Sequence, residues 1–259
     1  KHSMRELAET VTERERINRE LEIAADLNRK AMVDVPPEMP GLQVAASNIP
    51  AKEVGGDYYD VLPIDANRTG LLIADAAGKG FHSTLLMTHT RSVFRVLAQD
   101  SHTPASILGK TNDFLCREQP GLKGLFITFF YAIYDAESRK LTYANAGHHL
   151  PLLISGSDGS TRSLAAQNLP LSILENQRYE EGSVALDRGD IVLLYTDGVI
   201  EASNTARDMF GLNRLAKIVE GARAEHPHVI LDQIAASVRA FAGSAPQFDD
   251  MTLLGLKAR

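Results

Sequence analysis

Apolar residues recur at three- and four-residue spacing through residues 4–32, a stretch that contains neither Gly nor Pro. This spacing predicts one long amphipathic helix. Its apolar positions are Leu7, Val11, Ile17, Leu21, Ala24, Ala25 and Leu27. The heptad is imperfect because Arg14 and Asn28 fall in register with Leu7 and Leu21. Two interpretations therefore stay open: pairing with a second copy, or packing on its own domain.

Prolines at positions 36, 37 and 40 then end the helical pattern. We therefore expect a linker or signalling helix over residues 1–34 and one main domain over residues 35–259. In the main domain, β-rich runs are predicted at 42–46, 57–62, 70–74, 126–134, 140–145, 150–154, 182–186, 191–195 and 251–256. Helical periodicity is predicted at 80–98, 104–117, 211–221 and 229–242.

Short connections decide the expected strand direction. Residues 135–139 and 155–160 are too few for a parallel crossover, so the strands beside them should form antiparallel hairpins. Two pairs of helices would then cover sheet faces that are otherwise apolar and exposed. The pattern predicts a layered α+β domain and fits a doubly wound parallel sheet less well.

Composition narrows the class of protein. The chain has 259 residues, 44% of them hydrophobic, which is enough for one large globular domain with an appendage. A net charge of -6 disfavours nucleic acid and anionic membranes as partners. Apolar runs such as 125–134 are too short to span a membrane, and the N-terminus lacks the apolar core of a signal peptide. The single cysteine, Cys116, cannot form an internal disulfide, so we expect a soluble protein in the reducing cytoplasm.

The same cysteine lies among Ile107, Leu108, Phe114 and Leu115, a pattern that predicts a packed core thiol. A catalytic nucleophile is the less favoured interpretation of this residue.

Aspartates at strand ends are the candidate chemistry. Asp57 follows two glycines, which allow a tight turn, and begins a predicted strand. Strand alternation places Asp60 on the opposite face, so these two carboxylates should not share a site. Taken alone, Gly-Gly-Asp is also ordinary turn chemistry.

Four further acids also lie near the ends of predicted strands. Asp75 and Asp197 each end an apolar strand before a Gly-containing loop, and Asp249 with Asp250 precedes the last strand. Asp75 could instead be the N-cap of the following helix. Adjacent acids repel unless a cation or hydrogen bonds compensate them.

These acids share a ligand chemistry. A carboxylate set with almost no His or Cys nearby favours Mg²⁺ or Mn²⁺ over Zn²⁺. His148 and His149 cannot both face one metal from an extended segment, so a structural or rim role is expected for each.

In order, the chain contains Val-Gly-Gly-Asp57-Tyr-Tyr-Asp, Ile-Ala-Asp75-Ala-Ala-Gly-Lys-Gly, Asn145-Ala-Gly-His148-His-Leu-Pro151, Tyr-Thr-Asp197-Gly-Val-Ile-Glu201, Met209-Phe-Gly211 and Asp249-Asp-Met-Thr252. This set resembles the PPM-type metal-dependent serine/threonine phosphatases of the bacterial SpoIIE/RsbU branch, over about residue 24 to the C-terminus. Two departures stand out: Ser172 lies where many relatives have Gly, and Asn28 replaces a frequent Gln.

The resemblance implies an αββα sandwich of two antiparallel sheets flanked by helical pairs. It also implies two Mn²⁺ or Mg²⁺ ions that activate a water to hydrolyse a phosphoserine or phosphothreonine. Asp75 would bridge both ions, Asp57 and the Ala76 carbonyl would hold one, and Asp197 with Asp249 would hold the other. Asp250 matches a less certain neighbouring position, and the acid that protonates the leaving group is not identified.

The implied partners are a phosphorylated anti-sigma-factor antagonist of STAS type as substrate, and an upstream sensory or receiver domain. A homodimer through the N-terminal helix is a further expectation. The main alternative is a partner-switching binding module with little catalysis. A nucleotide cyclase or hydrolase also uses paired aspartates, but the Walker motif and a basic phosphate clamp are missing from the sequence.

Overall fold

The computed structural model describes residues 38–52, 55–78, 80–99, 103–118 and 124–259. The predicted N-terminal helix and the domain boundary after residue 34 lie outside these residues. The described strands are β1 (Glu38–Met39), β2 (Leu42–Ile49), β3 (Asp57–Pro63), β4 (Arg68–Ala76), β5 (Ile127–Asp135), β6 (Lys140–Ala146), β7 (Leu152–Ile154), β8 (Thr161–Ser163), β9 (Glu181–Ala185), β10 (Ile191–Tyr195) and β11 (Met251–Ala258). The described helices are α2 (Phe81–Leu97), α3 (Pro104–Glu118), α4 (Asp197–Ile200), α5 (Leu212–Gly221) and α6 (Pro227–Ala242).

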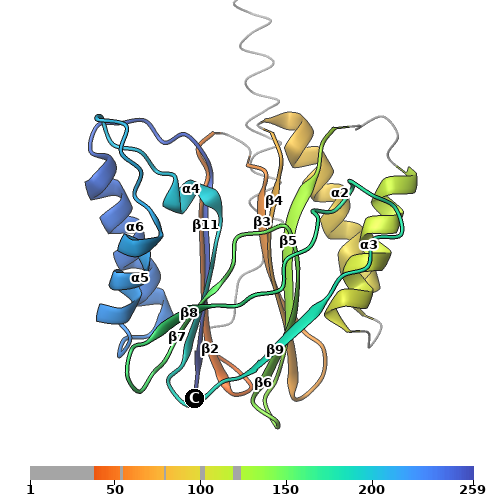
Figure 1. Cartoon of the computed structure of the whole chain (residues 1–259), viewed down its shortest axis with the longest axis horizontal. Helices are drawn as coiled ribbons and strands as arrows, with labels where there is room; N and C mark the ends of the chain where they lie inside the picture. The colour runs from red at the N-terminus through yellow and green to blue at the C-terminus, as the bar shows by residue number, and fades with distance from the viewer. Residues whose placement is uncertain (1–37, 53–54, 79, 100–102, 119–123) are drawn as a thin grey trace, which may run out of the picture.

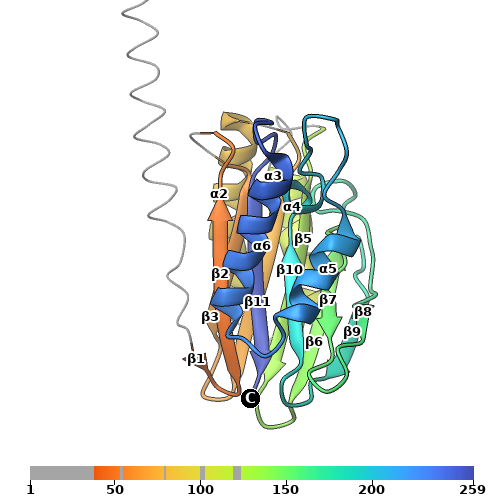
Figure 2. The same ribbon diagram turned by 90° about the vertical axis from the view of Figure 1, so that its left-hand side faces the viewer.

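The strands form two sheets that face each other (Figure 1). Over the described residues, one sheet has the order β1-β2-β11-β10-β7-β8 and the other β3-β4-β5-β6-β9. Neighbouring strands in both sheets are antiparallel, including β5 and β6, which form the hairpin predicted around residues 135–139. Residues 155–160 also connect antiparallel strands, as predicted, although the second of these, β8, was not itself expected. Helices α5 and α6 cover the first sheet, and α2 and α3 cover the second (Figures 1 and 2). The predicted αββα sandwich is confirmed.

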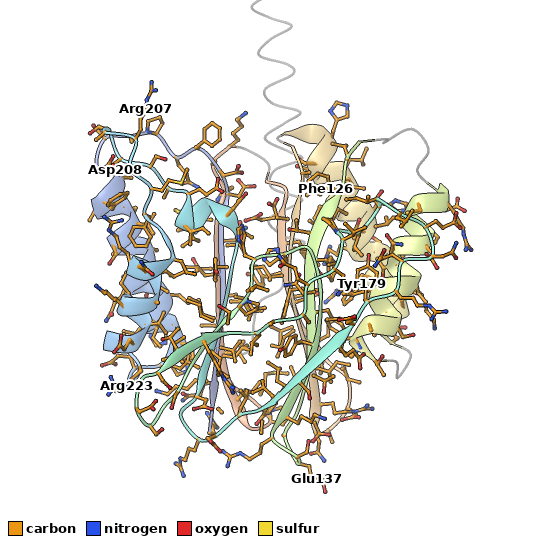
Figure 3. The ribbon with its side chains drawn as sticks, in the orientation of Figure 1. Phe126, Glu137, Tyr179, Arg207, Asp208 and Arg223 are labelled. Atoms are coloured by element: carbon orange, nitrogen blue, oxygen red, sulfur yellow. The ribbon has the colours of Figure 1, made fainter. Side chains whose placement is uncertain are left out.

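Apolar residues are buried in three layers. Between the sheets, inward-facing side chains such as Val44, Ile73 and Phe130 pack together, and Figure 3 shows side chains filling this space. A second cluster joins α2 and α3 to their sheet, and a third joins α5 and α6 to the other. This explains why the central strands are apolar on both faces: each has a sheet on one side and a helix on the other.

Some local predictions need correction. The strands β1 and β8 were not predicted, because the first has only two residues and the second is exposed along its length. The short helix α4 was expected to be only a turn. Cys116 is only partly buried, and its Sγ lies 3.8 Å from Asn112 Oδ1 one turn earlier on α3, so the predicted packed core thiol is only partly correct. Burial raises the pKa of the Cys116 thiol, which disfavours the reactive thiolate.

No helix in the described part of the chain is both long and apolar enough to cross a membrane.

Ser172 adopts a backbone conformation that normally requires glycine. Its φ is 70°, and its N–H donates to Asn112 Oδ1 at 3.0 Å, which holds the segment against α3. A left-handed conformation costs a non-glycine residue about 1–2 kcal/mol, part of which glycine loses again as unfolded-state entropy. We therefore expect Ser172→Gly to raise the free energy of unfolding by about 0.5–1 kcal/mol in urea titrations. Ser172→Ala keeps the strain, so an equal gain from alanine would contradict this explanation.

Candidate active site

Asp57 stands where the two sheets meet. It begins β3, is 3% exposed, and its Oδ2 accepts hydrogen bonds from Thr196 Oγ1 at 2.8 Å and Thr252 Oγ1 at 2.6 Å. Both threonines belong to the opposite sheet or its connection to α4. Burial, followed by the charge of Asp75, raises the pKa of Asp57 well above its usual value, and the two hydroxyl groups partly offset this.

Asp75 lies directly opposite Asp57 in the β3–β4 pairing. The charge of Asp75 acts directly on Asp57, so the two carboxylates are close neighbours. Burial and then the charges of Asp197, Asp249 and Asp250 raise the pKa of Asp75 to about 7. The N-cap alternative is wrong, since α2 has Gly80 at its N-cap and Asp75 lies within β4.

Asp197 and Asp249 approach from the other sheet. Asp197 begins α4 two residues after β10 ends, and Asp249 lies in the loop before β11. Burial and then the charge of Asp249 raise the pKa of Asp197. The four predicted acids thus interact electrostatically at one end of the sandwich, although they are distributed over both sheets.

Asp250 supports the segments that carry these acids. Its carboxylate accepts the backbone N–H groups of Ala51 and Gly56 at 2.8 Å each, just before β3. Close packing then demands glycine: a Cβ on Gly55 would lie 2.4 Å from Asp250 Oδ2, and one on Gly198 would lie 2.0 Å from the Asp250 carbonyl oxygen. Neither Gly55 nor Gly56 has a positive φ. The predicted tight turn is therefore not the reason for these glycines, which instead permit close approach.

Ala76 ends β4 and is buried. Its N–H donates to the Gly56 carbonyl oxygen at 3.3 Å. A Cβ on Gly56 would come within 3.2 Å of the Ala76 carbonyl oxygen, so glycine keeps the space beside this oxygen free. The role of Ala76 as a metal ligand stays a prediction.

A narrow pocket of about 10 Å³ opens among these acids, with room for a single water- or ion-sized group. Its wall includes Asp75, Asp249 and Asp250, together with Lys52. Within the described ranges, no three His, Cys, Asp or Glu side chains are arranged as a complete ligand set. The donor chemistry nevertheless fits a hard divalent cation, because the acids are oxygen ligands whose mutual repulsion a cation would relieve.

Asp60 is separated from this site, as strand alternation predicted. It is fully buried and bonds Arg95 of α2, with Arg95 Nε to Asp60 Oδ2 at 2.7 Å. The Tyr58 hydroxyl also donates to this carboxylate, and Arg91 Nε contacts the same hydroxyl at 3.2 Å. This network anchors α2 to β3.

His148 connects the two sheets from inside. It is 1% exposed, and its Nε2 donates to the Tyr195 carbonyl oxygen at 3.2 Å. Because a neutral imidazole has one N–H, Nδ1 must accept from Thr128 Oγ1 at 2.9 Å. Burial lowers the pKa of His148 to about 3, so the ring is neutral at physiological pH. Its predicted structural role agrees with these contacts, while His149 stacks on the Tyr195 ring.

Comparison with known proteins decides the family. The family model described as Stage II sporulation protein E (SpoIIE) matches residues 65–259. The chain belongs to the SpoIIE family. It is 31% identical over 204 residues to Phosphoserine phosphatase RsbU of Bacillus subtilis, a match that covers 79% of this chain and 60% of RsbU.

Solved structures share the fold. The RsbU and RsbW domains of Rv1364c from Mycobacterium tuberculosis superpose with a TM-score of 0.74 at 26% identity, covering 88% of this chain and 62% of that chain. The SiaA-PP2C domain of Pseudomonas aeruginosa gives a TM-score of 0.80 at 21% identity, covering 95% and 98%. This SpoIIE-family chain spans at most 60% of the curated relatives RsbU, IcfG and RsbP.

Two site residues of this SpoIIE-family chain were present in the quoted motifs but had no predicted role. Thr196 precedes Asp197, and Thr252 ends Asp-Asp-Met-Thr, yet both donate to Asp57, which is far away in sequence. A threonine within the Asp197 motif and another within the Asp249 motif were the available signal. Only the folded sheets show which carboxylate the hydroxyl groups serve.

Proposed function

We propose that this chain is a metal-dependent phosphoprotein phosphatase that hydrolyses phosphoserine or phosphothreonine. The observation that carries the proposal is the meeting of Asp57, Asp75, Asp197 and Asp249 from two sheets, where their charges repel. Burying such a cluster is unfavourable unless a cation compensates it. Membership of the SpoIIE family and the similarity to Phosphoserine phosphatase RsbU support the reaction class.

The residues would divide the work as follows. Asp75, which interacts with the other acids of the site, would contact both of two Mn²⁺ or Mg²⁺ ions. Asp57 and the Ala76 carbonyl would hold one ion, and Asp197 with Asp249 the other. When bound, the ions would supply an activated water and offset charge on the phosphoryl oxygens.

The rest of the chain positions these ligands. Thr196 and Thr252 bond one oxygen of Asp57, which fixes the orientation of that carboxylate. Asp250 holds the backbone before β3, and His148 fixes the strand that ends before Asp197. Ligands fixed in advance lose less entropy on binding and hold the reacting groups in place.

The natural substrate and the mode of regulation are part of the same proposal. The natural substrate would be a phosphorylated STAS-type anti-sigma-factor antagonist, which the sequence resemblance favours. One solved relative combines RsbU and RsbW domains, which supports a place in a partner-switching system. An upstream sensory or receiver domain would act through residues 1–34, with a homodimer as one mode of control.

The test uses p-nitrophenyl phosphate, which needs no protein docking. We expect hydrolysis to require Mn²⁺ or Mg²⁺ and to stop on chelation. Asp197→Asn should lower kcat/KM by about a hundredfold or more, because a ligand oxygen becomes an uncharged amide. The matched control is Asp232→Asn, which changes an exposed aspartate on α6.

Equal rates of p-nitrophenyl phosphate hydrolysis by the unmodified protein, Asp197→Asn and Asp232→Asn would refute the proposed phosphatase activity. If, in addition, binding to a phosphorylated STAS protein survived the loss of Asp197, the chain would be a binding module.

A further inference from the structure

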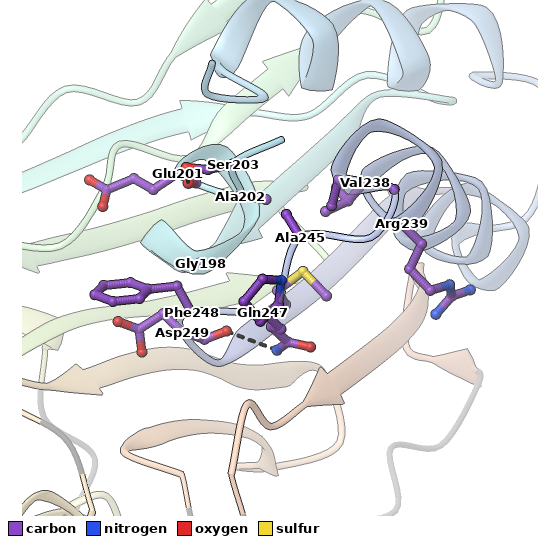
Figure 4. Close-up of a pocket in the computed structure, with 14 residues that line it drawn as sticks. Gly198, Glu201, Ala202, Ser203, Val238, Arg239, Ala245, Gln247, Phe248 and Asp249 are labelled. Carbon is purple, nitrogen blue, oxygen red and sulfur yellow. Dashed lines mark hydrogen bonds between the residues drawn. The ribbon is translucent and has the colours of Figure 1, made fainter. Parts of the chain in front are cut away.

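A second, larger pocket lies beside the acids. It measures about 220 Å³ and is formed by α4 and the residues after it, the C-terminal end of α6, and the loop that leads to β11 (Figure 4). Most of its wall is apolar, including Val238, Ala242, Ala245, Pro246, Phe248 and Met251. Cavities of about 150 Å³ already accommodate a benzene ring, so this pocket has room for a branched or aromatic side chain.

The pocket adjoins the candidate active site. Phe248 and Asp249 line both this pocket and the narrow pocket that contains Asp75. Gly198, the residue after Asp197, also belongs to its wall. A phosphorylated residue held at the acids would therefore place its sequence neighbours at the mouth of the apolar pocket.

The distribution of polarity indicates what fits. Val238 and Met251 are buried and form the inner wall, whereas Phe248 is 78% exposed. Glu201 and Phe248 lie on one side of the pocket, and Arg239 lies on the other with its guanidinium directed away (Figure 4). Charged groups thus stand at the rim of an apolar interior. This arrangement suits an uncharged apolar side chain better than a charged one.

We propose that this pocket binds an apolar side chain of the phosphoprotein substrate, one or two residues from the phosphorylated serine or threonine. The inference rests on the proposed function, and it adds a specificity site that selects substrates by local sequence. Contact with Phe248 would couple the two pockets, because this residue faces both.

The experiment compares short phosphoserine peptides. A parent peptide has asparagine at each position flanking the phosphoserine, and its variants carry one leucine at each of these positions in turn. We expect leucine at one position to raise kcat/KM by about tenfold, the discrimination that an apolar pocket typically gives. If no leucine position improves on the parent peptide, the proposal is wrong.

Variants of α6 locate the effect. Ala242→Phe should fill the pocket and abolish the preference for leucine, measured as the ratio of kcat/KM between the leucine and parent peptides. Ala240→Phe is the matched control, since Ala240 lies on the same helix but is exposed and outside the pocket. Should Ala242→Phe unfold, Ala245→Leu gives a milder filling from the neighbouring loop.

A leucine preference that persists in a folded pocket-filled variant would overturn the proposal. The proposal would also be wrong if a pocket-filled variant hydrolysed p-nitrophenyl phosphate faster than the unmodified protein, or had a different molecular mass in solution. Either result would indicate that the pocket normally holds a segment of this protein. If the unmodified protein hydrolyses no p-nitrophenyl phosphate with metal, the proposed function itself fails, which is a separate result.

Discussion

Asp75→Asn should abolish metal-dependent hydrolysis and yet stabilise the metal-free protein. Asp75 interacts with every other acid of the site, and its pKa is raised to about 7 by burial and their charges. Because this folded-state pKa exceeds that of the unfolded chain, the stabilising contribution of the protonated carboxyl is present below about pH 4 and lost as pH rises through about 7. Asparagine has nearly the same shape and no charge to lose.

The expected sizes are about a thousandfold loss in kcat/KM and about 2 kcal/mol gain in unfolding free energy at pH 8. Urea titrations of chelator-treated protein at pH 5 and pH 8 measure the gain in unfolding free energy, which should be much smaller at pH 5. Asp232→Asn is the control for removing one negative charge. If Asp75→Asn kept the turnover of the unmodified protein, Asp75 would not belong to the active site. If its free energy of unfolding at pH 8 were lower than that of the unmodified protein, the argument from charge repulsion would be wrong.

His148 should make the folded protein sensitive to acid. Its pKa of about 3 in the folded state lies below that of an unfolded histidine, about 6.5, because burial disfavours the imidazolium. Stability from the neutral ring is therefore fully present above about pH 6.5 and is lost as pH falls toward 3. The shift corresponds to about 5 kcal/mol.

His148→Gln isolates this effect. Glutamine can still donate to the Tyr195 carbonyl and accept from Thr128, but it does not titrate. We expect the variant to be about 1–2 kcal/mol less stable than wild type at pH 7, with the difference shrinking or reversing near pH 4. The raised carboxylate pKa values act in the opposite direction in both proteins, so they cancel in this difference. His82→Gln, an exposed change on α2, should show no such trend; a constant difference for His148→Gln would refute the assignment.

The periodic elements could be predicted from sequence because each has a buried face. Helix α6 was expected at 229–242 and spans Pro227–Ala242, since its apolar residues repeat at helical spacing. The strand β8 gave no signal because all three of its residues are exposed, so burial imposes no alternation on them. The short connections predicted antiparallel strand pairing, and all neighbouring strands in the described part of the structure are antiparallel.

The site was predictable as a set of acids, but its supporting contacts were not. Asp57, Asp75, Asp197 and Asp249 stood out because each occupies the end of a predicted strand. The need for glycine at position 198 depends on the backbone of Asp250, which belongs to another strand connection. Such close approaches depend on tertiary structure and leave no local pattern. The same holds for Arg95, which only the packing of α2 on β3 brings to Asp60.

The position of β11 has a consequence for synthesis on the ribosome. This strand lies between β2 and β10, and its Thr252 accepts a hydrogen bond from Asn48, 204 residues earlier in the chain. Until β11 leaves the ribosome, β2 has no partner on that side, and Asp57 lacks the Thr252 hydroxyl. Domains generally fold as units during translation, and contacts this distant form late. A nascent chain that stops before residue 251 should therefore lack both a closed first sheet and the Thr252 hydroxyl that orients Asp57, so we expect it to be inactive although it already contains all four acids.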